Sequence, residues 1–251
     1  MMEFKDISTP AESKQTAEAP RTEEIDALNR VLNAPERPVV AVLGGAKLSS
    51  KISVLKNLVG KLDAVIIGGG MANTFLYSQG APMGLSLYEE NQVATVREIE
   101  ALAEISGCRI LLPSDVVTAR TFKANAKTKI VPADKCPKDA MILDAGPRAV
   151  SAFEAELADA RTILWNGPLG AFEIKPFDRS TVHLARAVAD MTRQGLAVSI
   201  AGGRGTVAAL NEAEIADDFT HVSTAGGAFL QWLEGRTLAG IAAIMHTPLA
   251  A

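Results

Sequence analysis

Short apolar runs that end in glycine, proline or aspartate recur along the chain, and most of them are separated by stretches of helical periodicity. The runs are PVVAVLGG, LDAVIIGGG, CRILLPSD, AMILDAGP, RTILWNGP, LAVSIAGG and THVSTAGG. Continuous apolar strands joined by helices are typical of a parallel sheet covered on both faces, and right-handed crossovers leave few topologies open. We therefore predict a three-layer α/β/α fold with a doubly wound, Rossmann-like parallel sheet.

The chain is long and apolar enough for one large domain. It has 251 residues, of which 48% are hydrophobic. Residues 1–22 are rich in Lys, Glu, Thr, Ser, Ala and Pro without periodic apolar positions, which favours a flexible tail. We expect one α/β domain over 23–244 and a second tail over 245–251.

Charge and cysteine content argue against several classes of function. A net charge of -4 and a pI near 5.5 disfavour nucleic acid and anionic membranes as partners. The two cysteines and three histidines are scattered, so neither a disulfide framework nor a metal cluster is indicated. No apolar run approaches the roughly 20 residues that span a bilayer, and the N-terminus has no apolar signal core. We expect a cytoplasmic protein.

The loops that follow parallel strands share one edge of the sheet, where open α/β folds bind ligands. The first such loop, Gly44-Gly45, leads into a predicted helix with Lys47 and Lys51 near its start. Spaced i and i+4, the two lysines would lie about 6 Å apart on one helix face and suit a polyphosphate. Two solvated surface lysines are the equally open alternative. The spacing is not that of a Walker A motif.

Two more glycine loops repeat this arrangement. IIGGGMANTF contains Gly68, Gly69 and Gly70, and STAGGAFLQWLEG contains Gly226 and Gly227. Glycine lets a ligand approach the backbone, and the helix that follows presents free amide groups. Close packing of strand against helix also requires glycine, so this alternative stays open.

The segment ILWNGPLGAFE combines several candidate ligand contacts. Asn166 offers an amide at the binding edge, and Pro168 shapes a rigid loop that presents Glu173 as an acceptor for hydroxyl groups. Asn166 and Glu173 could equally be turn-forming residues. Trp165 is better explained by core packing.

Seven ordered motifs carry a family resemblance: GGAKLSSKI, DAVIIGGGMANTFL, LPSDVV, LDAGP, WNGPLGAFE, FDRST and STAGGAFLQWLEG. In this order and at this spacing they resemble the nucleotide-binding C-terminal domain of phosphoglycerate kinase, over about residues 22–244. The family transfers a phosphoryl group between ATP and 3-phosphoglycerate, so the resemblance implies that ATP or ADP is the ligand. It implies catalytic roles at Lys47, Lys51, Gly226 and Gly227, and nucleotide contacts at Gly45, Gly68, Gly69, Gly70, Asn166, Pro168, Glu173, Gly203, Arg204 and Thr206.

One motif departs from the family pattern. Where the family is similar to GGGDT, this chain reads GGRGT, so Arg204 replaces a glycine and Gly205 replaces the aspartate that holds magnesium. Magnesium needs oxygen ligands, so we expect its binding to be weak or absent. Arg204 either pairs with a phosphate directly or points to solvent in a loop that has drifted.

No stretch of the sequence resembles the family's N-terminal domain, which binds 3-phosphoglycerate. Phosphoryl transfer depends on positioning both substrates, so the isolated chain is expected to be inactive. Three hypotheses stay open: a nucleotide-binding domain that works with a separate N-terminal-type domain, a pseudoenzyme that binds a protein partner, and an enzyme that uses Arg204 to bind a phosphorylated metabolite without metal.

Overall fold

The structure is a computed structural model that describes residues 35–223 and 226–236. Both predicted tails, 1–22 and 245–251, lie outside the described residues. The same holds for the two ends of the predicted domain, 23–34 and 237–244. The predicted domain boundaries therefore stay predictions.

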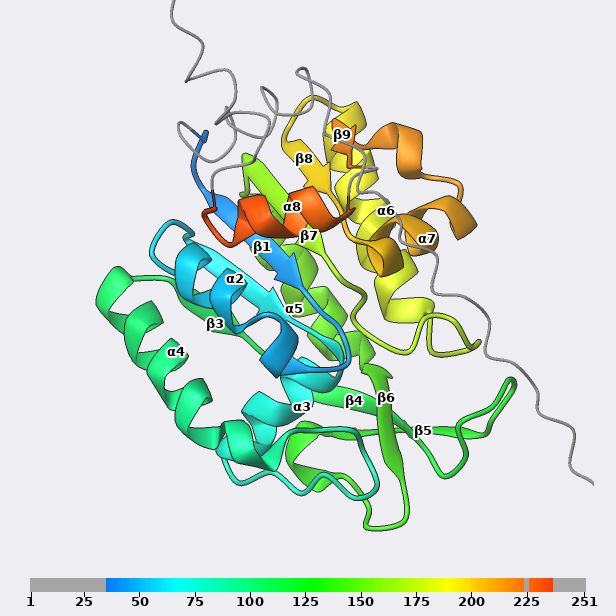
Figure 1. Ribbon diagram of the computed structural model, residues 1–251. Coiled ribbons are helices and arrows are strands. Elements are labelled where there is room, and N and C mark those ends of the chain that lie inside the picture. Colours follow the sequence, from blue (N-terminus) through cyan, green and yellow to red (C-terminus); the bar gives the residue numbers. More distant parts are fainter. Residues whose placement is uncertain (1–34, 224–225, 237–251) are drawn as a thin grey trace, which may run out of the picture.

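Six parallel strands form the central sheet in the order β3-β2-β1-β7-β8-β9 (Figure 1). From β1 in the middle of the sheet the chain moves outward to β3, returns to the middle at β7 and moves outward the other way. This confirms the doubly wound parallel sheet. The strands are β1 (Val39–Leu43), β2 (Ala64–Ile67), β3 (Arg109–Leu111), β7 (Thr162–Asn166), β8 (Val198–Ala201) and β9 (His221–Val222).

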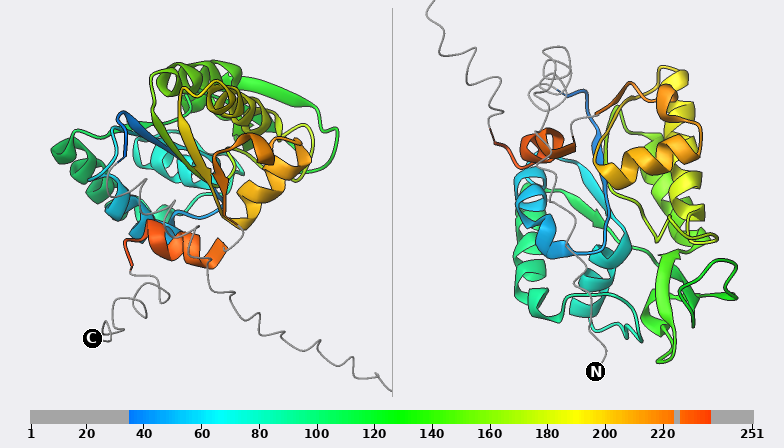
Figure 2. Two further views of the ribbon diagram at one scale, coloured as in Figure 1. Left: turned by 90° about the horizontal axis from the view of Figure 1, so that it is seen from above. Right: turned by 45° about the vertical axis from the view of Figure 1, so that its right-hand side comes forward.

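Helices cover both faces of this sheet and form the two outer layers (Figure 2). One face carries α2 (Ile52–Leu58), α3 (Gly69–Ser78), α4 (Val93–Ser106) and α8 (Gly226–Leu233). The other face carries α5 (Pro147–Ala158), α6 (Arg179–Arg193) and α7 (Arg204–Glu212). Short 3-10 turns are η1 (Leu48–Ser50), η2 (Glu90–Gln92), η3 (Ala133–Lys135) and η4 (Ala216–Asp218).

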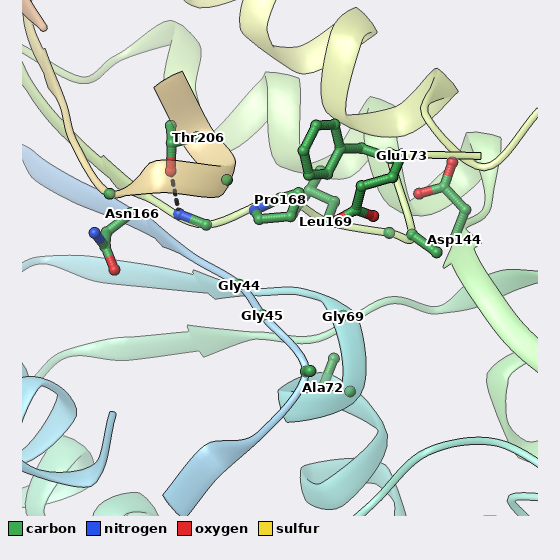
Figure 3. A pocket seen from close by; sticks show the side chains of 18 of the residues that line it. Gly44, Gly45, Gly69, Ala72, Asp144, Asn166, Pro168, Leu169, Glu173 and Thr206 are labelled. Atoms are coloured by element: carbon green, nitrogen blue, oxygen red, sulfur yellow. Dashed lines mark hydrogen bonds between the residues drawn. The ribbon is translucent and has the colours of Figure 1, made fainter. Parts of the chain in front are cut away.

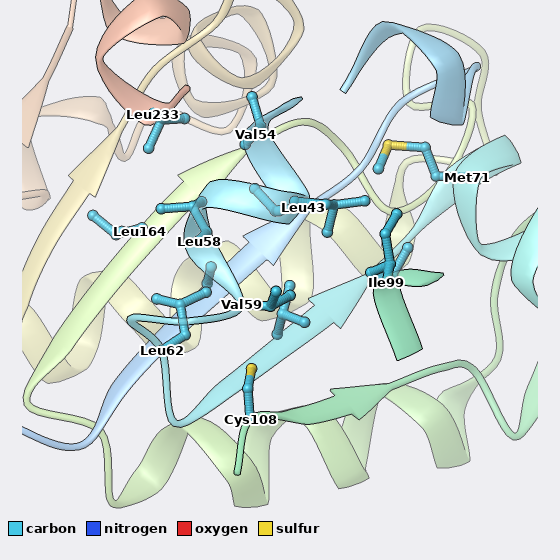
Figure 4. Close-up of a cluster of buried hydrophobic side chains, with 14 of the residues drawn as sticks. Leu43, Val54, Leu58, Val59, Leu62, Met71, Ile99, Cys108, Leu164 and Leu233 are labelled. Carbon is cyan, nitrogen blue, oxygen red and sulfur yellow. The ribbon is translucent and has the colours of Figure 1, made fainter. Parts of the chain in front are cut away.

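Alternation along the strands divides the core into two apolar layers. On β1, Val39, Ala41 and Leu43 face the α2 side, whereas Val40 and Val42 face the α5 side. All five residues are buried, as expected for a strand with helices on both faces. Figure 4 shows the first layer, in which leucine and valine side chains of α2 pack against the sheet.

A second, antiparallel sheet was not predicted. It has the order β5-β4-β6 and comprises β4 (Asp115–Ala119), β5 (Thr128–Pro132) and β6 (Met141–Ala145). The expectation that the run AMILDAGP forms a parallel strand is therefore wrong, because residues 141–145 pair with β4 in the antiparallel sense. An apolar run indicates burial but not the direction of its neighbour. The sheet lies at the lower end of the molecule in Figure 1.

The predicted helix start near Lys47 is also wrong. Lys47 has extended backbone angles, η1 follows it, and α2 begins only at Ile52. Lys47 and Lys51 therefore do not share a face of one α-helical turn. Leu48 and Leu55 of this segment are nonetheless fully buried, because both the 3-10 turn and α2 pack on the sheet.

Candidate functional site

The strand order changes direction between β1 and β7, and an open cleft of about 2230 Å³ lies beyond their ends. Its lining comes from the loops after β1, β2, β7 and β8 and from the first residues of α7 and α8. Loops on either side of such a reversal diverge, so the fold itself leaves a crevice there. The structure thus brings most of the predicted site residues to one place.

Several glycines in these loops allow backbones to approach one another. A Cβ at Gly44 would lie 1.9 Å from the Pro168 carbonyl oxygen, and one at Gly70 would lie 2.3 Å from the Ala46 oxygen. Gly69 combines a φ of +65° with a close neighbour, since a Cβ there would lie 2.7 Å from the Gly45 oxygen. These contacts fit the packing alternative for the glycine loops. They also fix the relative position of the three loops that form the cleft wall.

Gly68 stands apart from the rest of its triplet. It is buried, and a Cβ there would meet the side chain and backbone of Leu169. It is not among the residues that line the cleft, whereas Gly69 and Gly70 are. In the described structure its visible role is the packing of one loop on another.

Gly45, Gly226 and Gly227 each leave room for a Cβ among the described residues. A Cβ at Gly45 would find its nearest atoms, in Met71 and Lys51, at 3.9–4.0 Å. Among the described residues nothing lies within 4 Å of such a position at Gly227, and at Gly226 the nearest atoms are 3.9 Å away. All three line the cleft. Packing within the described part of the chain therefore does not explain these glycines, apart from the positive φ of Gly45.

The side-chain amine of Lys51 lies between the ends of β1 and β7. Its Nζ donates hydrogen bonds to the Gly44 oxygen (2.7 Å) and to the Asn166 oxygen (2.6 Å). Burial lowers the pKa of this lysine from 10.5 to about 7. A neutral amine has two hydrogens, and the two carbonyl groups account for both. An anion that enters the cleft would favour the protonated form.

Lys47 takes a different position. Its side chain is exposed, and the residue is not among those that line the cleft, although its neighbour Ala46 is. Of the two lysines that the sequence places together, Lys51 lines the cleft and Lys47 does not. Solvent exposure of Lys47 matches the alternative left open for it.

Asn166 ends β7 and is only 3% exposed. Its Nδ2 donates to the Gly202 oxygen at 2.8 Å, which ties the end of β7 to the loop after β8. Its Oδ1 has no hydrogen-bond partner among the described residues. A Cβ at Gly203 would lie 2.6 Å from Nδ2, so the GGRGT loop needs glycine at this position as well as for its φ of +92°.

Thr206 holds the next part of the same wall. Its Oγ1 accepts a hydrogen bond from the Gly167 backbone N–H at 2.6 Å (Figure 3). This bond fixes the loop that carries Pro168, which lines the cleft. The hydroxyl hydrogen of Thr206 stays available for a further acceptor.

Two carboxylates line the cleft in the described part of the chain, Glu173 and Asp144. Glu173 is exposed, as a residue that reaches toward a ligand requires. Figure 3 shows both carboxylates at the end of the view opposite Asn166. Asp144 was missed by sequence reasoning, although the strand end LDAGP contains it.

Asp144 is buried and already has partners. Its carboxylate accepts hydrogen bonds from Ser180 N, Ser180 Oγ and Ala145 N. Burial raises its pKa to about 7 despite these bonds. The residue therefore anchors the start of α6 to β6, and its oxygens are engaged with protein donors.

Arg204 is the first residue of α7, and its side chain is exposed at the cleft. No ion pair of Arg204 is present within residues 35–223 and 226–236. Beside it, a Cβ at Gly205 would meet Pro168 Cδ at 3.5 Å and Phe172 Cε1 at 3.7 Å, which are ordinary contacts. The site thus has room for a side chain at 205 and lacks one.

Comparison with known proteins identifies the family. The sequence model of the family described as phosphoglycerate kinase matches residues 20–236. Relatives described as phosphoglycerate kinase include those of Dinoroseobacter shibae, 58% identical, and a Ruegeria species, 57% identical; each match covers 88% of this chain and 56% of the relative. The chain belongs to the phosphoglycerate kinase family.

Solved structures agree with this assignment. The phosphoglycerate kinase of Coxiella burnetii superposes with a TM-score of 0.83 at 42% identity, over 87% of this chain and 56% of that one. The enzyme of Pyrococcus horikoshii gives 0.72 at 28% identity, over 89% and 55%. The chain therefore spans little more than half the length of the phosphoglycerate kinases that it matches.

A magnesium ion, which the family resemblance implies, does not fit the residues present. Magnesium is usually bound through one or two carboxylates together with substrate phosphates. Position 205 has no side chain, and the oxygens of Asp144 are engaged with Ser180 and Ala145. The described residues contain no group of three or more potential metal ligands. Among these residues Glu173 alone combines a carboxylate with exposure at the cleft.

No helix in the described ranges is long and apolar enough to cross a membrane.

Proposed function

We propose that this phosphoglycerate kinase family chain is a nucleotide-binding domain for ADP or ATP. The observation that carries the proposal is the placement of positive groups around one cleft. Lys51 lies at the ends of β1 and β7, and the N-termini of α7 and α8 open into the same cleft. Helix N-termini and a lysine at the reversal point of a doubly wound sheet suit a polyphosphate.

Glu173 supports the nucleoside half of this proposal. Its exposed carboxylate lines the cleft in the loop after β7 and can accept hydrogen bonds from ribose hydroxyl groups. The apolar lining includes Leu85, Leu87 and Phe122, which are themselves exposed and suit the face of a base. The cleft thus offers separate surfaces for phosphates, sugar and base.

We further propose that the chain takes part in phosphoryl transfer between ATP and 3-phosphoglycerate only together with a domain that supplies the 3-phosphoglycerate site. Transfer requires both substrates in line, and the described cleft offers groups for the nucleotide. We also propose that the protein is located in the cytoplasm.

The test is a titration followed by a transfer assay. The purified chain is titrated with ADP by calorimetry, and Lys51→Met is expected to bind at least about tenfold more weakly because a charge-assisted contact is lost. Lys56→Met, on the exposed surface of α2, is the matched control. Transfer is then measured as ADP formation that depends on 3-phosphoglycerate, with the amino-terminal part of the Dinoroseobacter shibae relative added in excess.

The second candidate is a protein-binding scaffold without transfer activity. The changed GGRGT loop favours it, since a carboxylate is missing where the family pattern has one. Nucleotide binding without any transfer in the mixed assay supports the scaffold, provided that the intact relative is active under the same conditions. Absence of ADP binding in wild type would contradict the nucleotide proposal itself.

A further inference from the structure

Arg204 adds positive charge where the fold already concentrates it. It is the first residue of the nine-residue helix α7, whose N-terminal end carries a partial positive charge. The N-cap, Gly203, supplies no capping side chain, and the side chain of Arg204 is exposed at the cleft. A cation at this end of a helix is unfavourable by itself. The arrangement becomes favourable when an anion lies against it.

A second helix N-terminus meets the first. A Cβ at Gly226, the first residue of α8, would lie 3.9 Å from both the Arg204 backbone N and the Gly203 Cα. The first amide groups of a helix have no intrahelical acceptors. No atom of the described residues outside the helix's own backbone and the neighbouring residues lies within 4 Å of a Cβ position at Gly227. The amide groups of two helix N-termini therefore lie side by side at the cleft, and Arg204 lines the cleft at the first of them.

Asn166 gives an independent indication of a ligand. It is 97% buried at the cleft, and its Oδ1 has no donor among the described residues. A buried acceptor without a donor is costly, and a hydroxyl or amino group of a bound nucleotide can supply that donor, whereas phosphate oxygens, which only accept, do not. Its Nδ2, by contrast, is held by Gly202 beside the start of α7.

The carboxylates that a metal–nucleotide complex would need are not provided. Gly205 follows Arg204 directly, and Asp144 is occupied by Ser180 and Ala145. Metal-free ADP carries more negative charge than its magnesium complex. A cleft that has gained a guanidinium at position 204 and has no carboxylate at position 205 therefore complements the metal-free form better.

We infer that the cleft selects nucleoside polyphosphates in their metal-free form, with the Arg204 guanidinium supplying the charge that a divalent cation would otherwise supply. This inference rests on the proposed nucleotide function and adds that magnesium lowers the affinity for the nucleotide. Magnesium, which would bridge nucleotide and protein through a carboxylate, here competes with Arg204 for the phosphates.

The experiment is calorimetric titration of the full chain with ADP, once with EDTA and once with magnesium in large excess over ADP. We expect binding in EDTA and at least about tenfold weaker binding with magnesium, because one charge-assisted contact is lost. Arg204→Ala is expected to weaken binding in EDTA by a similar factor and to remove the difference between the two conditions. Arg204→Lys should retain part of the difference, since it keeps the charge but not the planar fork of donors.

Arg97→Ala on α4 is the matched control, because Arg97 is equally exposed and does not line the cleft. It removes the same charge and should leave both affinities unchanged. A thermal melt of each variant confirms folding. Binding that is unchanged or strengthened by magnesium, or unaffected by Arg204→Ala, overturns the inference and leaves the nucleotide proposal standing. Absence of binding in both conditions overturns the proposed function and this inference with it.

Discussion

The side-chain amine of Lys51 donates a hydrogen bond to the backbone oxygen of Asn166 across 2.6 Å, and so joins the segment after β1 to the end of β7. The same amine contacts the Gly44 oxygen. The lysine thus lies at the point where the sheet order reverses, in a surrounding that favours its neutral form.

Binding of ADP should therefore take up a proton. Burial holds the Lys51 pKa at about 7, and nearby phosphate would raise it by favouring the charged amine. Affinity is expected to fall as the pH rises from 7 to 9. Calorimetry at pH 8 in two buffers with different ionisation enthalpies measures the uptake, which should approach one proton per ADP. Lys56→Met should keep this uptake, and its absence in wild type would argue against Lys51 as a phosphate contact.

Asp144 should make the free energy of unfolding depend on pH. Its pKa is 3.8 when unperturbed and about 7 in the folded chain, so between these values the folded state binds more protons than the unfolded state. The free energy of unfolding attributable to Asp144 therefore falls as the pH rises from 4 to 7. Between pH 5 and 7 the fall is on the order of 2 kcal/mol.

Urea denaturation at pH 5 and pH 7 measures this contribution. Asp144→Asn should lack it, whereas Asp159→Asn, at an exposed position after α5, should retain it. Lys51, whose pKa in the folded chain is about 7, loses protons only near the upper end of this window, so its contribution there is small and of opposite sign. Equal pH dependence in wild type and Asp144→Asn would show that the carboxyl group keeps an ordinary pKa.

Substitution by alanine should destabilise the fold strongly at one glycine of the cleft, Gly44, and only slightly at another, Gly227. Gly44→Ala places a methyl group 1.9 Å from the Pro168 oxygen, so the free energy of unfolding should fall by about 3 kcal/mol. Gly227→Ala meets no atom within 4 Å in the described part of the chain and should change the free energy of unfolding by less than about 1 kcal/mol. If Gly227 faces bound phosphate, Gly227→Ala weakens ADP binding while the fold stays intact. Chemical denaturation and ADP titration separate the two effects.

Thr206 should act through Gly167. Thr206→Val leaves the Gly167 N–H buried without its acceptor, at a cost of about 1–3 kcal/mol in the free energy of unfolding. Thr206→Ser keeps the hydroxyl and is expected to lose much less. Amide hydrogen exchange at Gly167 should accelerate in the valine variant alone, and equal exchange in both variants would count against this bond.

A carboxylate restored at position 205 should change the response to magnesium. A side chain fits beside Pro168 and Phe172 in ordinary contact. Near the N-terminus of α7, Gly205→Asp should raise the free energy of unfolding by about 0.3–1 kcal/mol. Magnesium should then strengthen ADP binding by this variant, with Gly205→Asn as the uncharged control. A variant whose ADP binding is still weakened by magnesium would show that the missing carboxylate is not the deciding difference.

The sequence predicted the parallel core because the apolar pattern of a buried strand can be recognised within a few neighbouring residues. The runs that became β1, β2 and β7 are apolar on both faces, and only strands with helices on both sides bury such residues. The ordered motifs identified the family, which the comparisons confirm. The cleft position followed from the fold, since loops after parallel strands gather at one edge.

Tertiary contacts decided the rest. An apolar run such as 141–145 does not specify its neighbour, so the antiparallel sheet could not be read from it. The i, i+4 spacing of Lys47 and Lys51 predicted a shared helix face, but a 3-10 turn separated them, leaving one exposed and the other on two carbonyl groups. Asp144 and Ser180 lie 36 residues apart and meet only when β6 packs beside α6. Sequence determined which residues follow the strands, and packing determined which of them face the cleft, because side-chain direction depends on neighbours that are distant in the chain.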